Sequence, residues 1–229
     1  MVGAGAGRLR RWAGLLAGGE GDGDMSADPV AAVAGVPVHV GEVDAREAWL
    51  RNGPRAAALP PSGTGEGRQL RRWLTQLIVT ERVIAAEAAA RNLTAAAAPT
   101  EVELLPDVAA RLEIGSVAAA VLADPYARAL FADVTAAVVV TDDQVADYHL
   151  RNPLRFAPLR PGGHGWRVPA VAGPPLEQVR QAITGHLLGA ARRRAFRIWL
   201  DGRRAVSVRL APGYEHPADP RQPDNTHRH

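Results

Sequence analysis

The sequence predicts a mainly α-helical domain that carries a minimal sheet of two or three strands. Two long segments, 68–92 and 176–203, support the helical class because their apolar residues recur at three- and four-residue steps. Two short segments, 36–40 and 205–210, alternate apolar and polar residues as half-buried strands do. We expect these two strands to pair and so to join the N- and C-terminal segments of the domain.

The first elements follow one another closely. A turn at Ala34-Gly35 precedes the alternating strand 36–40, and a short helix is expected over 43–51. Residues 53–67 are rich in glycine, proline and serine and are predicted to form a loop. The long amphipathic helix then runs from Arg68 to about Asn92.

The middle of the chain predicts shorter helices. They fall within 107–137, and a further capped helix begins at Thr141 or Asp142 and stops at Asn152-Pro153. Residues 157–175 contain so many glycines and prolines that we expect an extended loop. The second long helix and the strand 205–210 complete the domain.

These elements divide the chain into a flexible leader over 1–29, one helical domain over 30–210 and a histidine- and proline-rich tail over 211–229. Met25 is an alternative start, which would make residues 1–24 an unstructured leader. No stretch approaches the roughly 18–20 apolar residues of a membrane helix, so we expect no membrane partner and a cytoplasmic protein.

The composition excludes several classes of site. The 229 residues include no cysteine, which excludes disulfides, thiol nucleophiles and thiolate metal sites. All 27 basic residues are arginine, which excludes a phosphate-binding lysine or a Schiff base. The net charge is only +3 and aromatic residues are few, which argues against a nucleic acid partner.

Four phrases in a fixed order carry a resemblance to a known family. They are VAGVPVHVGEVDA at 33–45, LRRWLTQLIVTERVIAAEAAARNL at 70–93, VTDDQVADYHLRNPLRFAP at 140–158 and the helix and strand over 176–210. Together they resemble the helical chaperone domain of the SurA/PrsA-type peptidyl-prolyl isomerases. The resemblance implies a SurA N-terminal-domain-like fold and a polypeptide client as partner.

The chain departs from that family where its parvulin isomerase domain is normally inserted. About twenty residues stand between Phe156 and Leu176 instead of about a hundred, and His164 lies in a glycine-rich loop. We therefore expect the isomerase domain to be missing and do not carry prolyl isomerase activity over to this chain.

The expected client site is an apolar groove between the two long helices. Its predicted lining is Trp73, Leu77, Ile78, Ile84, Ile183 and Leu187. The same periodic positions are equally those of an ordinary helical core.

The tail suggests a different chemistry, because imidazole and carboxylate groups together suit a transition metal ion. The candidate ligands are His216, Asp219, Asp224, His227 and His229. Such a site requires an ordered tail, for which Tyr214 is the expected anchor. The competing interpretation is a solvated, unorganised terminus.

Other polar groups have structural explanations from the sequence alone. Tyr148 and His149 suggest one core aromatic and one surface ring, although a general base is conceivable there. His186 borders an apolar stripe, and the arginines over 192–204 suit a helix C-terminus or, alternatively, a phosphate-binding patch.

The leading hypothesis is thus a non-catalytic, chaperone-like protein that binds polypeptide partners. The alternative is a small metal-dependent enzyme or biosynthetic accessory protein that uses the His/Asp tail. The sequence leaves open whether the chain is an enzyme.

Overall fold

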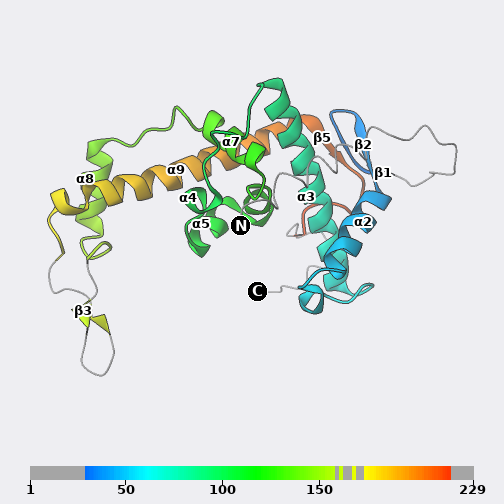
Figure 1. Ribbon diagram of the computed structural model, residues 1–229, viewed down its shortest axis with the longest axis horizontal. Helices are drawn as coiled ribbons and strands as arrows, with labels where there is room; N and C mark the ends of the chain where they lie inside the picture. The colour runs from blue at the N-terminus through cyan, green and yellow to red at the C-terminus, as the bar shows by residue number, and fades with distance from the viewer. Residues whose placement is uncertain (1–28, 158–159, 162–166, 169–172, 218–229) are drawn as a thin grey trace.

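The computed structural model describes residues 29–157, 160–161, 167–168 and 173–217. This part of the chain is mainly helical with a small antiparallel sheet, which confirms the predicted fold class. Figure 1 shows the sheet at one end of the molecule and α8 (Asp142–Arg151) at the other, connected by the long helix α9 (Leu176–Ser207).

The predicted elements follow in the predicted order with some shifted bounds, and the strand at 29–33 and the short ladder at 160–161 and 167–168 are additions that the sequence did not predict. The N-terminal part contains β1 (Pro29–Val33), β2 (Val36–His39), α2 (Val40–Arg51), the short 3₁₀ turn η1 (Ala56–Ala58) and α3 (Gly65–Ala90). The middle contains α4 (Glu101–Leu104), α5 (Val108–Ile114), α6 (Ser116–Val121) and α7 (Pro125–Val134). Between α8 and α9 lie β3 (Arg160–Pro161) and β4 (Arg167–Val168), and β5 (Val208–Leu210) follows α9.

The sheet has the strand order β2-β1-β5, so the predicted direct pairing of its outer strands is wrong. The strand β1 lies between them and pairs antiparallel with both. The last strand is also shorter than predicted, because α9 continues to Ser207, whose Oγ donates to the Arg203 carbonyl. The sheet nevertheless joins the two ends of the described chain, as expected.

The β1–β2 turn depends on two left-handed residues. Ala34 has φ 49° and Gly35 has φ 83°, the conformation of a type I′ hairpin turn. The outer edge of β2 is covered, because Pro37 has no N–H and its carbonyl accepts a 2.6 Å hydrogen bond from Arg82. Strand addition at that edge is therefore blocked.

The largest apolar cluster, here called the main core, unites the sheet with α3, α5, α6, α7 and the C-terminal half of α9. Its largest fully buried side chains include Leu74 of α3, Phe131 of α7 and Phe196 of α9. Phe131 and Phe196 have ring centroids 5.0 Å apart, and Trp199 stacks on Phe196 at 5.7 Å. We call the elements around the main core the body.

A second, smaller cluster lies at the far end of α9 (Figure 1). Val145 of α8 packs there against Val179 and Ile183 of α9, with half-buried residues at its margin. We call this cluster the distal core, and we call residues 139–157, which include α8, together with residues 176–187 the distal lobe. The described residues of the loop predicted over 157–175 include the two-residue ladder of β3 and β4.

Candidate functional site

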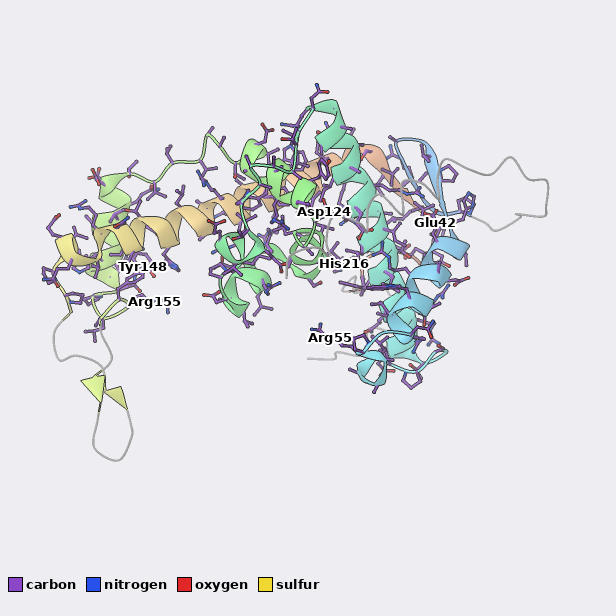
Figure 2. All side chains as sticks on the ribbon, in the orientation of Figure 1. Glu42, Arg55, Asp124, Tyr148, Arg155 and His216 are labelled. Atoms are coloured by element: carbon purple, nitrogen blue, oxygen red, sulfur yellow. The ribbon has the colours of Figure 1, made fainter. Side chains whose placement is uncertain are left out.

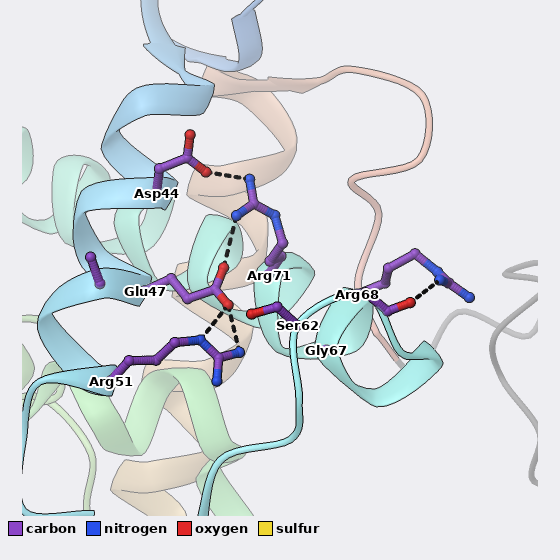
Figure 3. A pocket seen from close by; sticks show the side chains of 9 residues that line it. Asp44, Glu47, Arg51, Ser62, Gly67, Arg68 and Arg71 are labelled. Atoms are coloured by element: carbon purple, nitrogen blue, oxygen red, sulfur yellow. Dashed lines mark hydrogen bonds and ion pairs between the residues drawn. The ribbon is translucent and has the colours of Figure 1, made fainter. Parts of the chain in front are cut away.

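Two regions of the described surface have the features of a site. One is a shallow, open depression of about 450 Å³ between α2 and α3 (Figure 3). The other is the outer face of the distal lobe, which exposes apolar side chains. The depression is lined by Asp44, Glu47, Ala48, Arg51, Ser62, Gly63, Gly67, Arg68 and Arg71.

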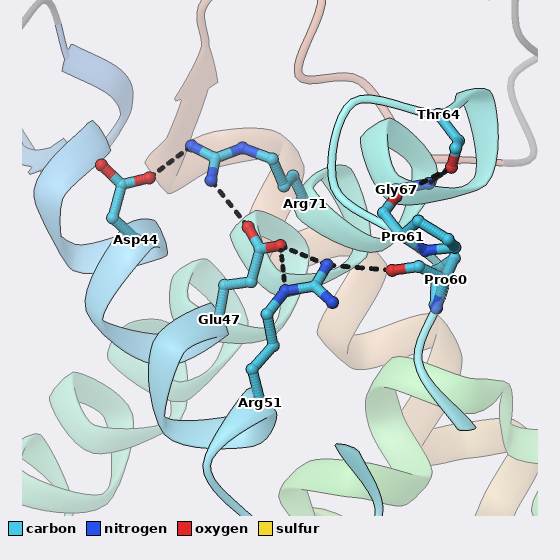
Figure 4. Close-up of polar contacts among 8 residues, drawn as sticks. All are labelled: Asp44, Glu47, Arg51, Pro60, Pro61, Thr64, Gly67 and Arg71. Atoms are coloured by element: carbon cyan, nitrogen blue, oxygen red, sulfur yellow. Dashed lines mark hydrogen bonds and ion pairs between the residues drawn. The ribbon is translucent and has the colours of Figure 1, made fainter. Parts of the chain in front are cut away.

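Glu47 is the centre of the depression, and its side chain is only 9% exposed. One carboxylate oxygen accepts hydrogen bonds from Nε and Nη2 of Arg51, at 2.9 and 2.6 Å. The other accepts a 2.8 Å bond from Arg71 of α3, which also donates to Asp44 at 2.6 Å. Figure 4 shows the resulting bridge from α2 to α3.

The electrostatics of Glu47 follow from these partners. Burial alone would raise the pKa of its carboxyl group, but hydrogen bonds from Arg51 and Arg71 and their positive charges outweigh that effect. The pKa of Glu47 therefore lies below its ordinary value, and the side chain is ionised at neutral pH. For the same reason the pKa of Arg71, lowered by burial but raised more by Asp44 and Glu47, lies above its ordinary value.

This arrangement is suited to holding the fold together. Arg51 also donates to the Pro60 carbonyl at 2.9 Å, so the Glu47 cluster fixes the loop that precedes α3. Arg51 and Arg71 form ion pairs with Glu47 and Asp44, so their positive charges are largely neutralised and attract an anionic ligand only weakly. We assign the depression a structural role.

Sequence reasoning missed this cluster. The i, i+4 spacing of Glu47 and Arg51 was a usable signal for a helix-surface ion pair. Nothing in the sequence pairs Glu47 with Arg71, which is 24 residues away on another helix.

Three large apolar side chains of the distal lobe are exposed. Leu150 of α8 is 78% exposed, Val139 before α8 is 77% exposed and Leu154 after it is 45% exposed. The distal core beneath them has three buried residues. Large apolar side chains are therefore left in solvent next to a small core.

The six residues predicted to line one client groove are divided between the two cores. The structure therefore does not bring these six residues together in one groove. Leu77, Ile78 and Ile84 are buried in the main core, and Trp73 packs at its margin with Nε1 donating to Ser116 Oγ at 3.2 Å. Ile183 is buried in the distal core, and Leu187 lies at that core's edge. Each apolar stripe is filled by its own neighbouring elements.

The histidines and aromatics of the distal lobe also pack against each other. Figure 2 places Tyr148 and Arg155 at this end of the molecule. The ring of His186 lies 5.5 Å from that of Tyr148 and 6.0 Å from that of Phe156. His149 is half-buried with Nε2 2.9 Å from the Pro174 carbonyl oxygen, so this ring is less exposed than expected.

The N-cap of α8 is Thr141, which is one of the two alternatives that the sequence predicted.

The basic end of α9 is largely engaged in contacts within the protein. Arg193 is buried and its Nε donates to Glu113 of α5 at 2.8 Å. Arg203 pairs with Glu87 and Arg204 donates to Gln76, both on α3. These cross-links between helices explain the arginine run better than helix-terminal charge does.

The tail is anchored where its described part begins. Tyr214 packs against the main core, and its carbonyl accepts a 2.8 Å hydrogen bond from buried Gln76. The Gly213 carbonyl accepts a bond from Arg72. Of the candidate metal ligands, His216 is exposed, and Asp219, Asp224, His227 and His229 lie outside the described residues. Within the described chain no group of three or more His, Asp or Glu side chains has the geometry for a metal ion, and the tail site stays a prediction.

Comparison with known proteins adds one match. Residues 29–66 match a family of unknown function (DUF7158). This segment contains the β1–β2 hairpin, α2 and the loop that Arg51 holds. Neither a curated protein nor a solved structure is detectably similar to the chain. Among the described helices, none is both long and apolar enough to cross a membrane.

Proposed function

We propose that the protein is a non-catalytic, chaperone-like module that binds apolar polypeptide segments through the outer face of its distal lobe. The observation that carries the proposal is the exposure of Leu150 and Val139, at 78% and 77%, beside a core of three buried residues. Large apolar side chains left exposed are a feature of protein-binding surfaces.

The resemblance supports the same class of function. The phrase over 140–158, which resembles the segment leading into the isomerase domain of SurA/PrsA-type proteins, forms α8 and the chain that follows it. The chain then returns to α9 after the short segment that holds β3 and β4. A binding role without isomerisation fits that arrangement.

The lobe also suggests the chemistry of its clients. Asp143, Asp147 and Leu150 are exposed and have i, i+4, i+7 spacing, so they share one face of α8. Asp147 is paired with Arg151, whereas Asp143 is at the first turn of the helix. An apolar segment flanked by a basic residue is complementary to this face.

The experiment is suppression of aggregation of a denatured client protein at stoichiometric concentration. The wild-type chain should delay light scattering, and the double variant Leu150→Ser/Leu154→Ser should lose most of the effect. Burying one leucine contributes about 1.5–3 kcal/mol, so losing two weakens binding by at least about tenfold.

The matched control is Val206→Ser, because Val206 is 74% exposed at the opposite end of α9. It should retain wild-type protection. Absence of protection by the wild-type chain would reject the function, and an equal loss in the Val206 variant would reject the distal lobe as its place.

A further inference from the structure

After β5 the chain makes a tight turn and then lies against α3. We call residues 211–217 the strap. The Tyr214 N–H donates to the Ala211 carbonyl at 3.2 Å, which closes a β-turn. The two central residues of this turn are Pro212 and Gly213, and Gly213 has φ 91°, as the third position of a type II turn requires. The strap therefore contains a Pro-Gly turn followed by an aromatic residue.

Polar side chains beneath the strap bind its main chain. Nε of Arg72 donates to the Gly213 carbonyl at 3.1 Å, and Nε2 of Gln76 donates to the Tyr214 carbonyl at 2.8 Å. The oxygen of the Gln76 amide accepts a hydrogen bond from Arg204 of α9, which holds the amide in this orientation. The two bonds to the strap are made to carbonyl groups, which every peptide has, so any peptide backbone of the same shape could accept them.

The side chains beneath the strap are buried, whereas the strap itself is partly in solvent. Arg72 is 6% exposed and Gln76 is 1% exposed, although both side chains are polar. Every residue over 211–217 is half-buried or exposed. A buried donor is destabilising when it loses its acceptor, so these two side chains favour a state in which carbonyl groups lie over them. The structure thus has a site for peptide carbonyl groups in the body.

The strap adds one apolar group and one charged group to these bonds. The side chain of Tyr214 packs at the margin of the main core. The carboxylate of Glu215 accepts a 2.9 Å hydrogen bond from the Gly213 N–H, which brings a negative charge to the residue that Arg72 contacts. An aromatic anchor combined with main-chain hydrogen bonds is typical of bound peptides. The ligand that fits the site is a Pro-Gly turn followed by an aromatic and an acidic residue.

From these observations we infer that Arg72, Gln76 and Arg204 form a peptide-binding site that the strap occupies as an intramolecular ligand. When the strap detaches, a separate peptide with a Pro-Gly turn, an aromatic residue and an acidic residue takes its place. A tethered segment has a high effective concentration, so the strap excludes separate peptides until it is weakened. The site lies in the body and does not depend on client binding by the distal lobe.

The test uses the full chain with the strap weakened and the site unchanged. Gly213→Ala strains the turn at φ 91° although the added Cβ meets no atom within 4 Å, and Tyr214→Ala removes the aromatic anchor. The probe is a fluorescently labelled synthetic peptide with the sequence of residues 211–217, and the readout is fluorescence anisotropy. We expect the Gly213→Ala/Tyr214→Ala variant to bind this peptide at least about tenfold more tightly than the wild-type chain.

A third substitution tests the site itself. Gln76→Leu, added to the double variant, should weaken peptide binding by about tenfold, because the carbonyl group of the peptide then lacks its donor. Gln181→Leu in the same background is the matched control, since Gln181 is exposed in the distal lobe, and it should leave the affinity unchanged. Equal peptide binding by the wild-type chain and the double variant, or an equal loss with Gln181→Leu, would overturn the inference.

A second measurement needs no substitution. If the strap detaches from the folded body, the Tyr214 amide should exchange its hydrogen through this local opening and therefore faster than the buried amides of α3. Excess unlabelled peptide should leave the exchange of α3 unchanged. Equal protection of the Tyr214 amide and of the α3 amides would show that the strap leaves only when the body unfolds, which contradicts a replaceable ligand.

Discussion

The body and the distal lobe share one helix but have apolar cores of very different size. In the body, α9 packs against several elements, and its Phe196 and Leu200 join a core that also includes the sheet and α3. In the lobe, the main packing partner of the same helix is α8, and their shared core contains three buried residues. We therefore expect the two ends of this continuous helix to differ in stability, because most helical stability in proteins comes from tertiary packing.

The largest expected effect is in the body. Phe196→Ala removes a fully buried ring that contacts Phe131 and Trp199, and it should lower the free energy of unfolding by about 3–5 kcal/mol. The measurement is urea denaturation followed by far-UV circular dichroism. A loss below about 1 kcal/mol would show that the main core does not limit stability.

The corresponding variant of the lobe is Ile183→Ala. Truncating this fully buried side chain should destabilise the distal core locally by about 2–4 kcal/mol. Because the body does not depend on that core, the main urea transition should stay in place while amide exchange in α8 accelerates. Coincident loss of protection in α3 would contradict the separation of the two regions.

The sequence predicts the body well and the lobe's relation to it poorly. The helix over 68–92 appears as α3 because its apolar stripe is long and packs against many elements. The helix over 176–203 appears as α9, but its stripe was interpreted as one face when it serves two cores on two sides. Periodicity shows that a position is buried, and it does not show which partner buries it.

The predicted site residues show the same limit. Ile78 and Ile183 have the same pattern in the sequence and were assigned to one groove, yet they belong to separate cores. Glu47 looks like a solvated helix residue, and its burial follows from Arg71, a partner that only the fold brings near. The alternation over 205–210 predicted a strand of six residues, but the first three, Ala205 to Ser207, belong to α9.

A third kind of stabilisation holds α2 to the body, and Glu47→Gln tests it. The helix α2 buries only Val43 and Glu47, so the charged cluster replaces part of a core there. Removing the charge leaves Arg51 and Arg71 without their shared carboxylate and should lower the free energy of unfolding by about 2 kcal/mol at pH 7. The measurement is thermal denaturation of the wild-type protein and of the Glu47→Gln variant.

The pH dependence of Glu47 has a definite sign. Its pKa is lowered in the folded chain, so its contribution is complete above the ordinary value of 4.5 and is lost as the pH falls through the folded pKa. The difference in the free energy of unfolding between the wild-type protein and the Glu47→Gln variant should therefore shrink below about pH 4.5. The control Glu81→Gln, at the more exposed Arg46–Glu81 pair, should change stability by less than about 1 kcal/mol. Equal effects of the two variants would reject a special role for Glu47.

The smallest expected effect is an increase in the stability of the body from its hairpin turn. Ala34 adopts φ 49° at the first central position of a type I′ turn, where asparagine is favoured and alanine is strained. Ala34 is exposed, so Ala34→Asn should raise the free energy of unfolding by about 0.5–1 kcal/mol without altering the core. Gly35→Ala should act in the opposite direction, because Gly35 has φ 83° and open space around its Cβ position, so that backbone strain alone is added. Amide exchange resolves where the gain appears: slower exchange in β1 and β2 with unchanged exchange in α8 is expected if the two regions are stabilised independently, and an equal slowing in α8 would show that they unfold together.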